Sequence, residues 1–136
     1  MSKSLSFFAQ RQKLLALLAA LYVVLLILSH ATLPSGHVWG IAVVFSIVMN
    51  GVYLTEARSL GAFVRTETVV GLTLIGLSLV GLAQPLAVIA AIFLHGCWDV
   101  AKHRGAGVPF FNWYTLSCFA VDTFYSGALL LYWIRA

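Results

Sequence analysis

Five long apolar runs dominate this sequence and restrict it to very few kinds of fold. They cover roughly residues 13–33, 38–56, 67–83, 85–103 and 110–133. A helix needs about 20 largely apolar residues to cross a bilayer, and each run reaches or approaches that length. Of the 136 residues, 62% are hydrophobic and only 9% are charged, against about 25% charged in soluble domains. We therefore expect an all-α, polytopic membrane bundle of about five transmembrane helices, forming a single domain over residues 1–136.

Lysine and arginine predict the orientation, because they collect in the cytoplasmic loops of membrane proteins. If the five spans alternate in direction, all the basic residues except Arg135 fall on one side: Lys3, Arg11, Lys13, Arg58, Arg65, Lys102 and Arg104. The N-terminus is therefore expected inside and the C-terminus outside.

The basic balance does not indicate a nucleic-acid-binding protein. The net charge is +4, but the basic residues are scattered in twos and threes with no patch or arm. Cys97 and Cys118 both lie in apolar runs, so no secreted disulfide framework is expected. The partners that this composition allows are the lipid bilayer, other membrane subunits and further copies of the chain.

Polar residues inside the last two runs are the strongest pointer to function. His95, Asp99 and His103 recur every four residues, so they share one helical face, as Cys118 and Asp122 also do. At about 1.5 Å per residue, His95 lies about 13 Å and Asp122 about 16 Å from the cytoplasmic ends of their runs. An aspartate facing lipid costs about 2.5–3.5 kcal/mol on insertion scales. We therefore expect His95 and Asp122 to meet directly or through one ion, with Asn50 at a similar depth.

Three interpretations of this polar set stay open. In the first, His95 and Asp122 form a structural hydrogen bond that orders two helices. In the second, a metal ion is bound by some or all of four candidate ligands: His95, Asp99, Asp122 and Cys118. Nitrogen and carboxylate ligands suit zinc or non-haem iron, whereas a cysteine ligand favours zinc or copper. In the third, the polar stripe relays protons or lines an ion path.

The other polar residues are expected to have plainer roles. Glu56 lies two residues before Arg58, and we expect an ion pair between them. Glu67 lies two residues after Arg65, which suggests a second pair. The alternative is that both glutamates extend the polar site toward the cytoplasm. His30 flanks the first external loop and is expected to be solvated.

The segment HGCWDVAKH resembles a family of small bacterial integral membrane proteins of unknown function. The family's pattern is His-x-x-Trp-Asp-x-x-His-His, followed by a Pro-Phe loop, serine-rich residues and Cys-x-x-x-Asp. Lys102 replaces the first histidine of the pair. The matching residues are His95, Trp98, Asp99, His103, Pro109, Phe110, Cys118 and Asp122. The resemblance implies that these residues act together, and it implies a bacterial inner (plasma) membrane location.

Together these features predict a metal-dependent membrane enzyme that acts on a lipid or isoprenoid-like substrate. Zinc or iron is the expected cofactor, with Asp99 and His103 as catalytic residues and His103 serving as an acid–base group or a partner of a ligand. Two alternatives are an accessory subunit of a larger membrane complex and a small proton or ion carrier. A cavity that reaches the site would favour the enzyme.

Overall fold

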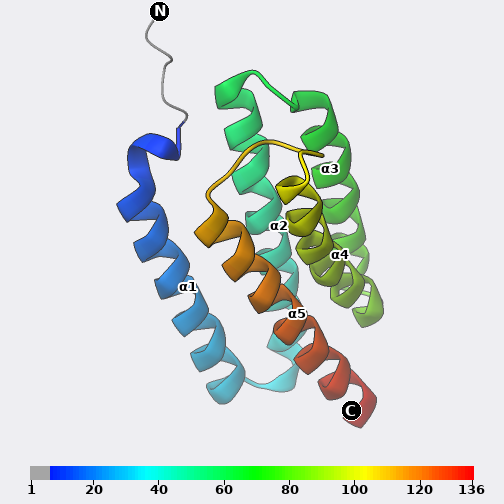
Figure 1. Cartoon of the computed structure of the whole chain (residues 1–136). Helices are drawn as coiled ribbons and strands as arrows, with labels where there is room; N and C mark the ends of the chain where they lie inside the picture. The colour runs from blue at the N-terminus through cyan, green and yellow to red at the C-terminus, as the bar shows by residue number, and fades with distance from the viewer. Residues whose placement is uncertain (1–6) are drawn as a thin grey trace, which may run out of the picture.

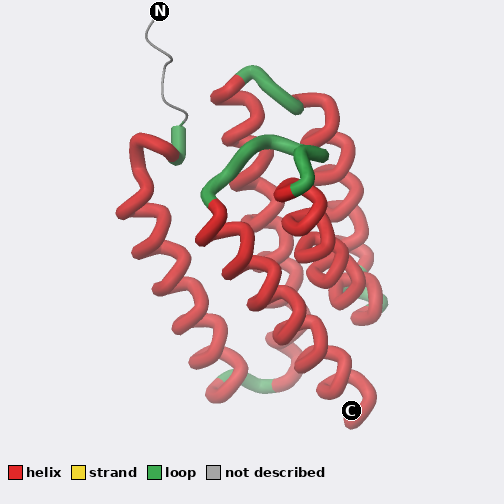
Figure 2. The backbone as a smooth tube through the Cα atoms, in the orientation of Figure 1, coloured by secondary structure: helices red, strands yellow, loops and turns green. Residues whose placement is uncertain are grey.

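The computed structural model describes residues 7–136, and every regular element within them is helical (Figures 1 and 2). The chain order is η1 (Ala9–Arg11), α1 (Gln12–Thr32), α2 (Ser35–Leu60), α3 (Val64–Val80), α4 (Pro85–His103) and α5 (Asn112–Arg135). The predicted all-α class is confirmed. Lys3, which entered the orientation argument, lies outside the described residues.

Four helices are long and apolar enough to cross a membrane. They are Ala9–Thr32, Gly36–Leu60, Pro85–His103 and Asn112–Arg135. The fifth, α3, has 17 residues, which give about 26 Å at 1.5 Å per residue. That length falls somewhat short of the roughly 30 Å hydrocarbon core of a bilayer.

Local sequence signals set the helix ends. α2 continues past its predicted end at residue 56 to Leu60, where Gly61 adopts a left-handed conformation with φ 66°. Glycine is the usual residue in that C-terminal position because it has no Cβ. α3 runs from 64 to 80 instead of 67 to 83. The bounds of α4 agree with the predicted run, and Pro85 occupies its first turn, where a missing N–H costs nothing.

The burial pattern is the reverse of that in a soluble protein. All four acidic residues are buried, namely Glu56, Glu67, Asp99 and Asp122, with exposed fractions of 3% or less. Large apolar side chains cover the outside, including Leu17 at 64% and Phe124 at 80% exposed. Apolar surface is stable next to lipid, whereas a carboxylate there is not. The four acidic side chains therefore make their contacts inside the bundle.

α4 is the central helix, packed against α2, α3 and α5. α1 lies at the outer side of the bundle, along α2 (Figure 1). Near its end, His30 Nε2 lies 2.8 Å from the Tyr125 hydroxyl of α5. The expectation that His30 is simply solvated is therefore wrong, because the helix end folds against α5 and half-buries the ring.

Candidate functional site

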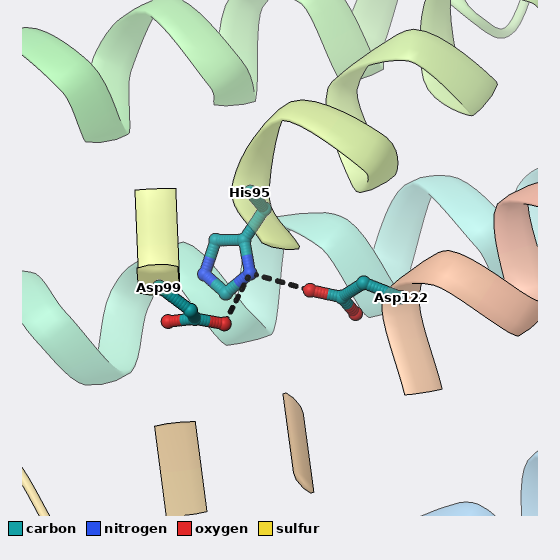
Figure 3. Close-up of side chains that lie close together, drawn as sticks. All are labelled: His95, Asp99 and Asp122. Atoms are coloured by element: carbon teal, nitrogen blue, oxygen red, sulfur yellow. Dashed lines mark hydrogen bonds and ion pairs between the residues drawn. The ribbon is translucent and has the colours of Figure 1, made fainter. Parts of the chain in front are cut away.

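His95, Asp99 and Asp122 meet between α4 and α5 (Figure 3). His95 Nδ1 lies 2.9 Å from Asp122 Oδ2 and 3.7 Å from Asp99 Oδ2. One nitrogen or oxygen from each residue lies within 4.8 Å of the others, and all three side chains are fully buried. The predicted contact between His95 and Asp122 is confirmed. We call these three residues the His–Asp–Asp centre.

Two features of α4 allow this meeting. His95 and Asp99 are one helical turn apart, so both point toward the same side of the helix. Gly96, next to His95, lies against α5, where an added Cβ would be 3.1 Å from the Asp122 Cβ. The small residue therefore lets α5 approach closely enough for Asp122 to reach the imidazole.

The centre has fewer hydrogen-bond partners than its polar atoms require. Within residues 7–136, His95 Nε2, Asp99 Oδ2 and Asp122 Oδ1 are buried and have no hydrogen-bond partner. A single Nδ1–H, if present, cannot fully satisfy two carboxylates. Buried polar groups without partners are rare in native proteins, and each needs a physical explanation. A cation or a shared proton bound between the two aspartates and His95 Nδ1 would satisfy the carboxylate oxygens, whereas His95 Nε2 would still need a partner.

Tyr53 of α2 holds two members of the centre in place. Its hydroxyl donates a hydrogen bond to Asp99 Oδ1, and its ring stacks on His95 with centroids 5.4 Å apart. Sequence reasoning missed this residue, although a signal was available. Ser46, Asn50 and Tyr53 follow the 4- and 3-residue spacing of one helical face, and all are buried. Asn50 itself donates to the Ser46 carbonyl, 2.8 Å away, and no hydrogen bond or ion pair joins it to the centre within the described chain.

A second buried polar group adjoins the centre. Glu67 of α3 accepts hydrogen bonds from Val108 N at 2.8 Å and Trp98 Nε1 at 3.1 Å. Its carboxylate also lies 3.4 Å from Lys102 Nζ. The ammonium in turn sits 2.9 Å from the centre of the Tyr53 ring, the geometry of a cation–π contact. Lys102 and Tyr53 thus connect Glu67 to the His–Asp–Asp centre.

The predicted pairing of the glutamates with neighbouring arginines is wrong. Glu67 pairs with Lys102, and Glu56 accepts the backbone N–H of Phe8 at 3.3 Å. Residues two apart on a helix point in different directions, so an exposed arginine at Arg65 or Arg58 cannot easily reach a buried acid. The alternative expectation, that the glutamates extend the polar interior toward this end of the bundle, agrees better with these contacts.

His103 and Cys118 lie outside the group of three. His103 is exposed at the end of α4, with Nε2 2.7 Å from the Thr115 hydroxyl. Cys118 is half-buried one turn before Asp122 and packs against apolar residues. At 3.6 residues per turn, Lys102 is only about 20° around the helix from His95, whereas His103 is about 80° away. Helical rotation therefore brings Lys102, and not His103, toward the centre.

Comparisons of the chain with protein-family models, with curated proteins and with solved structures found no match. The fold and the site together define an all-helical bundle with membrane-spanning character and a buried His–Asp–Asp centre. The resemblance of the HGCWDVAKH segment to a bacterial membrane family therefore stays a prediction from the motif.

Proposed function

We propose that this is an integral membrane protein whose His–Asp–Asp centre holds one divalent metal ion, zinc or iron. We further propose that the ion serves an enzyme acting on a lipid or isoprenoid-like substrate. One observation carries the proposal: three potential ligand atoms converge between two helices, and their side chains keep buried polar atoms without hydrogen-bond partners among the described residues.

The spacing of the ligand atoms supports a metal ion. Two ligands bound to one zinc ion at about 2.0–2.2 Å with tetrahedral angles lie about 3.4 Å apart. The observed separations from His95 Nδ1, 2.9 Å and 3.7 Å, fall on either side of that value. Three protein ligands would leave one position open, as in catalytic zinc sites.

The balance of buried charge supports the same proposal. Lys102 and Glu67 pair with each other, which leaves Asp99 and Asp122 as two carboxylates beside a single imidazole. Burying an ionised carboxylate without a counter-charge is very costly. One divalent cation would neutralise both aspartates and remove that cost.

Each residue would then have a distinct task. The ion would act as a Lewis acid and lower the pKa of a bound water. Tyr53 would hold Asp99 in place through its hydroxyl, and hydrogen-bond support of this kind tunes metal sites. His103, exposed next to Thr115 at the bundle end, lies outside the centre and would serve as an acid–base group only at the solvent end of a proton path.

Metal analysis tests this proposal directly. After purification in a neutral detergent without chelators, elemental mass spectrometry is expected to find about one zinc or iron ion per chain, because the centre offers one set of three ligands. Dialysis against a strong chelator should remove the ion, and re-addition should restore it. Wild-type protein that never carries a metal would eliminate the enzyme and leave the accessory subunit as the better proposal.

We also propose a bacterial inner-membrane location with the N-terminus inside, which requires α3 to cross as a fifth span. Basic residues support it. Those in and near η1, at the facing ends of α2 and α3, and at or just after the end of α4 lie at one end of the bundle, and Arg135, at the end of α5, lies at the other (Figure 1). In a variant lacking Cys97 and Cys118, a cysteine appended after Ala136 should react with an impermeant maleimide from the periplasmic side. Reaction from the cytoplasmic side alone would refute this topology.

A further inference from the structure

An apolar groove separates α1 from the bundle between two polar attachments. At one end the backbone N–H of Phe8 donates to Glu56, and at the other His30 meets Tyr125. Between them lies a cavity of about 370 Å³ along α1 and α2. A smaller cavity of about 90 Å³ adjoins it on the α5 side, and Ala19 belongs to both walls.

The inner cavity brings the groove close to the His–Asp–Asp centre. Its wall includes Tyr114 and Cys118 of α5. Cys118 is one turn before Asp122 and lies on the same face of the helix. A molecule filling both cavities would therefore extend from the lipid-exposed side of α1 to the neighbourhood of the centre.

The groove has the chemistry of a site for a neutral lipid. Its mouth is formed by apolar side chains such as Leu18 and Leu21, which are about half exposed, at 52% and 50%. None of the wall residues that the structure describes in these two cavities is charged. Tyr22 belongs to both walls, and its hydroxyl is buried without a hydrogen-bond partner in the part of the chain that the structure describes. These walls also carry the hydroxyls of Tyr114 and Ser117, but only the Tyr22 hydroxyl is buried without a hydrogen-bond partner among the described residues. The groove thus offers that group in largely apolar surroundings, the usual composition of a ligand pocket.

We infer that this groove binds a neutral, single-chain lipid, with the hydrocarbon chain against α1 and a hydroxyl or carbonyl oxygen at Tyr22. The larger cavity falls within the usual range of about 300–1,000 Å³ for ligand pockets. A phospholipid headgroup does not fit, because its charge would lie deep in the apolar interior without a counter-charge. The inference rests on the proposed function, since it names the substrate class of the same centre.

Photo-crosslinking tests the groove with defined probes. Full-length protein is reconstituted in phosphatidylethanolamine vesicles containing one diazirine probe at low content. The probes are a straight-chain alcohol, an isoprenoid alcohol and, as the charged control, phosphatidylglycerol. Crosslinked residues are located by peptide mass spectrometry. We expect one of the alcohols to label the walls formed by α1 and α5. The alcohol that gives the stronger labelling identifies the type of hydrocarbon chain that the groove binds.

Two variants, Ala19→Phe and Tyr22→Phe, test whether the labelling depends on the groove. Ala19→Phe fills the shared wall and is expected to lower groove labelling by at least about tenfold, one decade of affinity. Its matched control is Ala20→Phe, which adds the same ring at an exposed position and should leave labelling unchanged. Tyr22→Phe removes only the hydroxyl and should weaken alcohol labelling about fivefold, the effect of one net hydrogen bond. It tests the inference even if Ala19→Phe does not fold.

Measuring metal in the same samples separates this inference from the proposed function. Equal labelling of wild type and Tyr22→Phe, or labelling by phosphatidylglycerol as strong as by the alcohols, would overturn the inference, because bulk lipid would then fill the groove. Labelling that depends on Tyr22 in protein without metal would support the groove and reject the metal centre. Protein that carries the metal but shows no labelling dependent on Tyr22 would support the metal centre and reject the groove.

Discussion

Asp99→Asn is expected to yield a folded, membrane-inserted protein that has lost its bound metal. Asparagine keeps the shape of the side chain, and its oxygen can still accept the Tyr53 hydrogen bond. The amide nitrogen cannot bind a cation, and one of the two carboxylate charges beside His95 disappears. A purely structural Asp99 would tolerate the change at a cost of about 1 kcal/mol. Elemental analysis, together with thermal unfolding in detergent, distinguishes the two roles.

Glu56→Gln is the matched control for this variant. It makes the same carboxylate-to-amide change at a buried position, but Glu56 contacts the backbone of Phe8 and lies outside the His–Asp–Asp centre. We expect it to retain the metal. If Asp99→Asn keeps a full complement of metal, or both variants lose it equally, Asp99 is not a ligand and the proposed centre fails.

Much of the fold follows from the sequence because lipid imposes simple rules on it. The length of each apolar run sets a helix, and the Pro85–His103 run was predicted to the residue. The meeting of His95 and Asp122 was also predictable, since helical rise places them at matching depths and lipid would penalise both. These arguments need only distance along the chain and the energy of a polar group in the membrane.

The rest of the site depends on which face of each helix meets its neighbours. Tyr53 taken alone suggested an interfacial residue, because tyrosine commonly lies at membrane interfaces, and only its spacing from Ser46 and Asn50 pointed to the buried face. Lys102 was counted as an orientation signal, since lysines near helix ends usually extend to the interface. In the structure, the buried carboxylate of Glu67 draws the ammonium inward instead. Such a contact joins α3 to α4 and cannot be read from either helix alone.

Replacing Glu67 with alanine is expected to destabilise the protein by at least about 3 kcal/mol. The Val108 N–H and the Trp98 indole N–H would lose their acceptor, and Lys102 would lose its counter-charge. Each buried group left without a partner costs about 1–3 kcal/mol, and a charged one costs more. The midpoint of unfolding in a mixed-micelle denaturant titration measures the loss.

Arg65→Ala is the control on the same helix, because Arg65 is exposed and such changes usually fall within about ±0.5 kcal/mol. Equal midpoints for the Glu67 and Arg65 variants would show that Glu67 does not anchor the α4–α5 connection. Gly107→Ala offers an independent check, since its new Cβ would lie 2.5 Å from Glu67 Oε1 and 3.0 Å from the Trp98 ring. It should destabilise the same connection while leaving the carboxylate in place.

The Glu67 and Asp99 variants together separate the anchor from the centre. Glu67→Ala should lower stability more than metal affinity, because Glu67 makes no direct contact with Asp99 and is connected to it through Lys102 and Tyr53. Asp99→Asn should abolish metal binding with little change in the stability of the metal-free protein. Unfolding titrations of both variants, each with and without chelator, test whether stability or metal binding is affected more in each variant. Identical profiles for the two would mean that the polar interior is one structural network without a separate metal site.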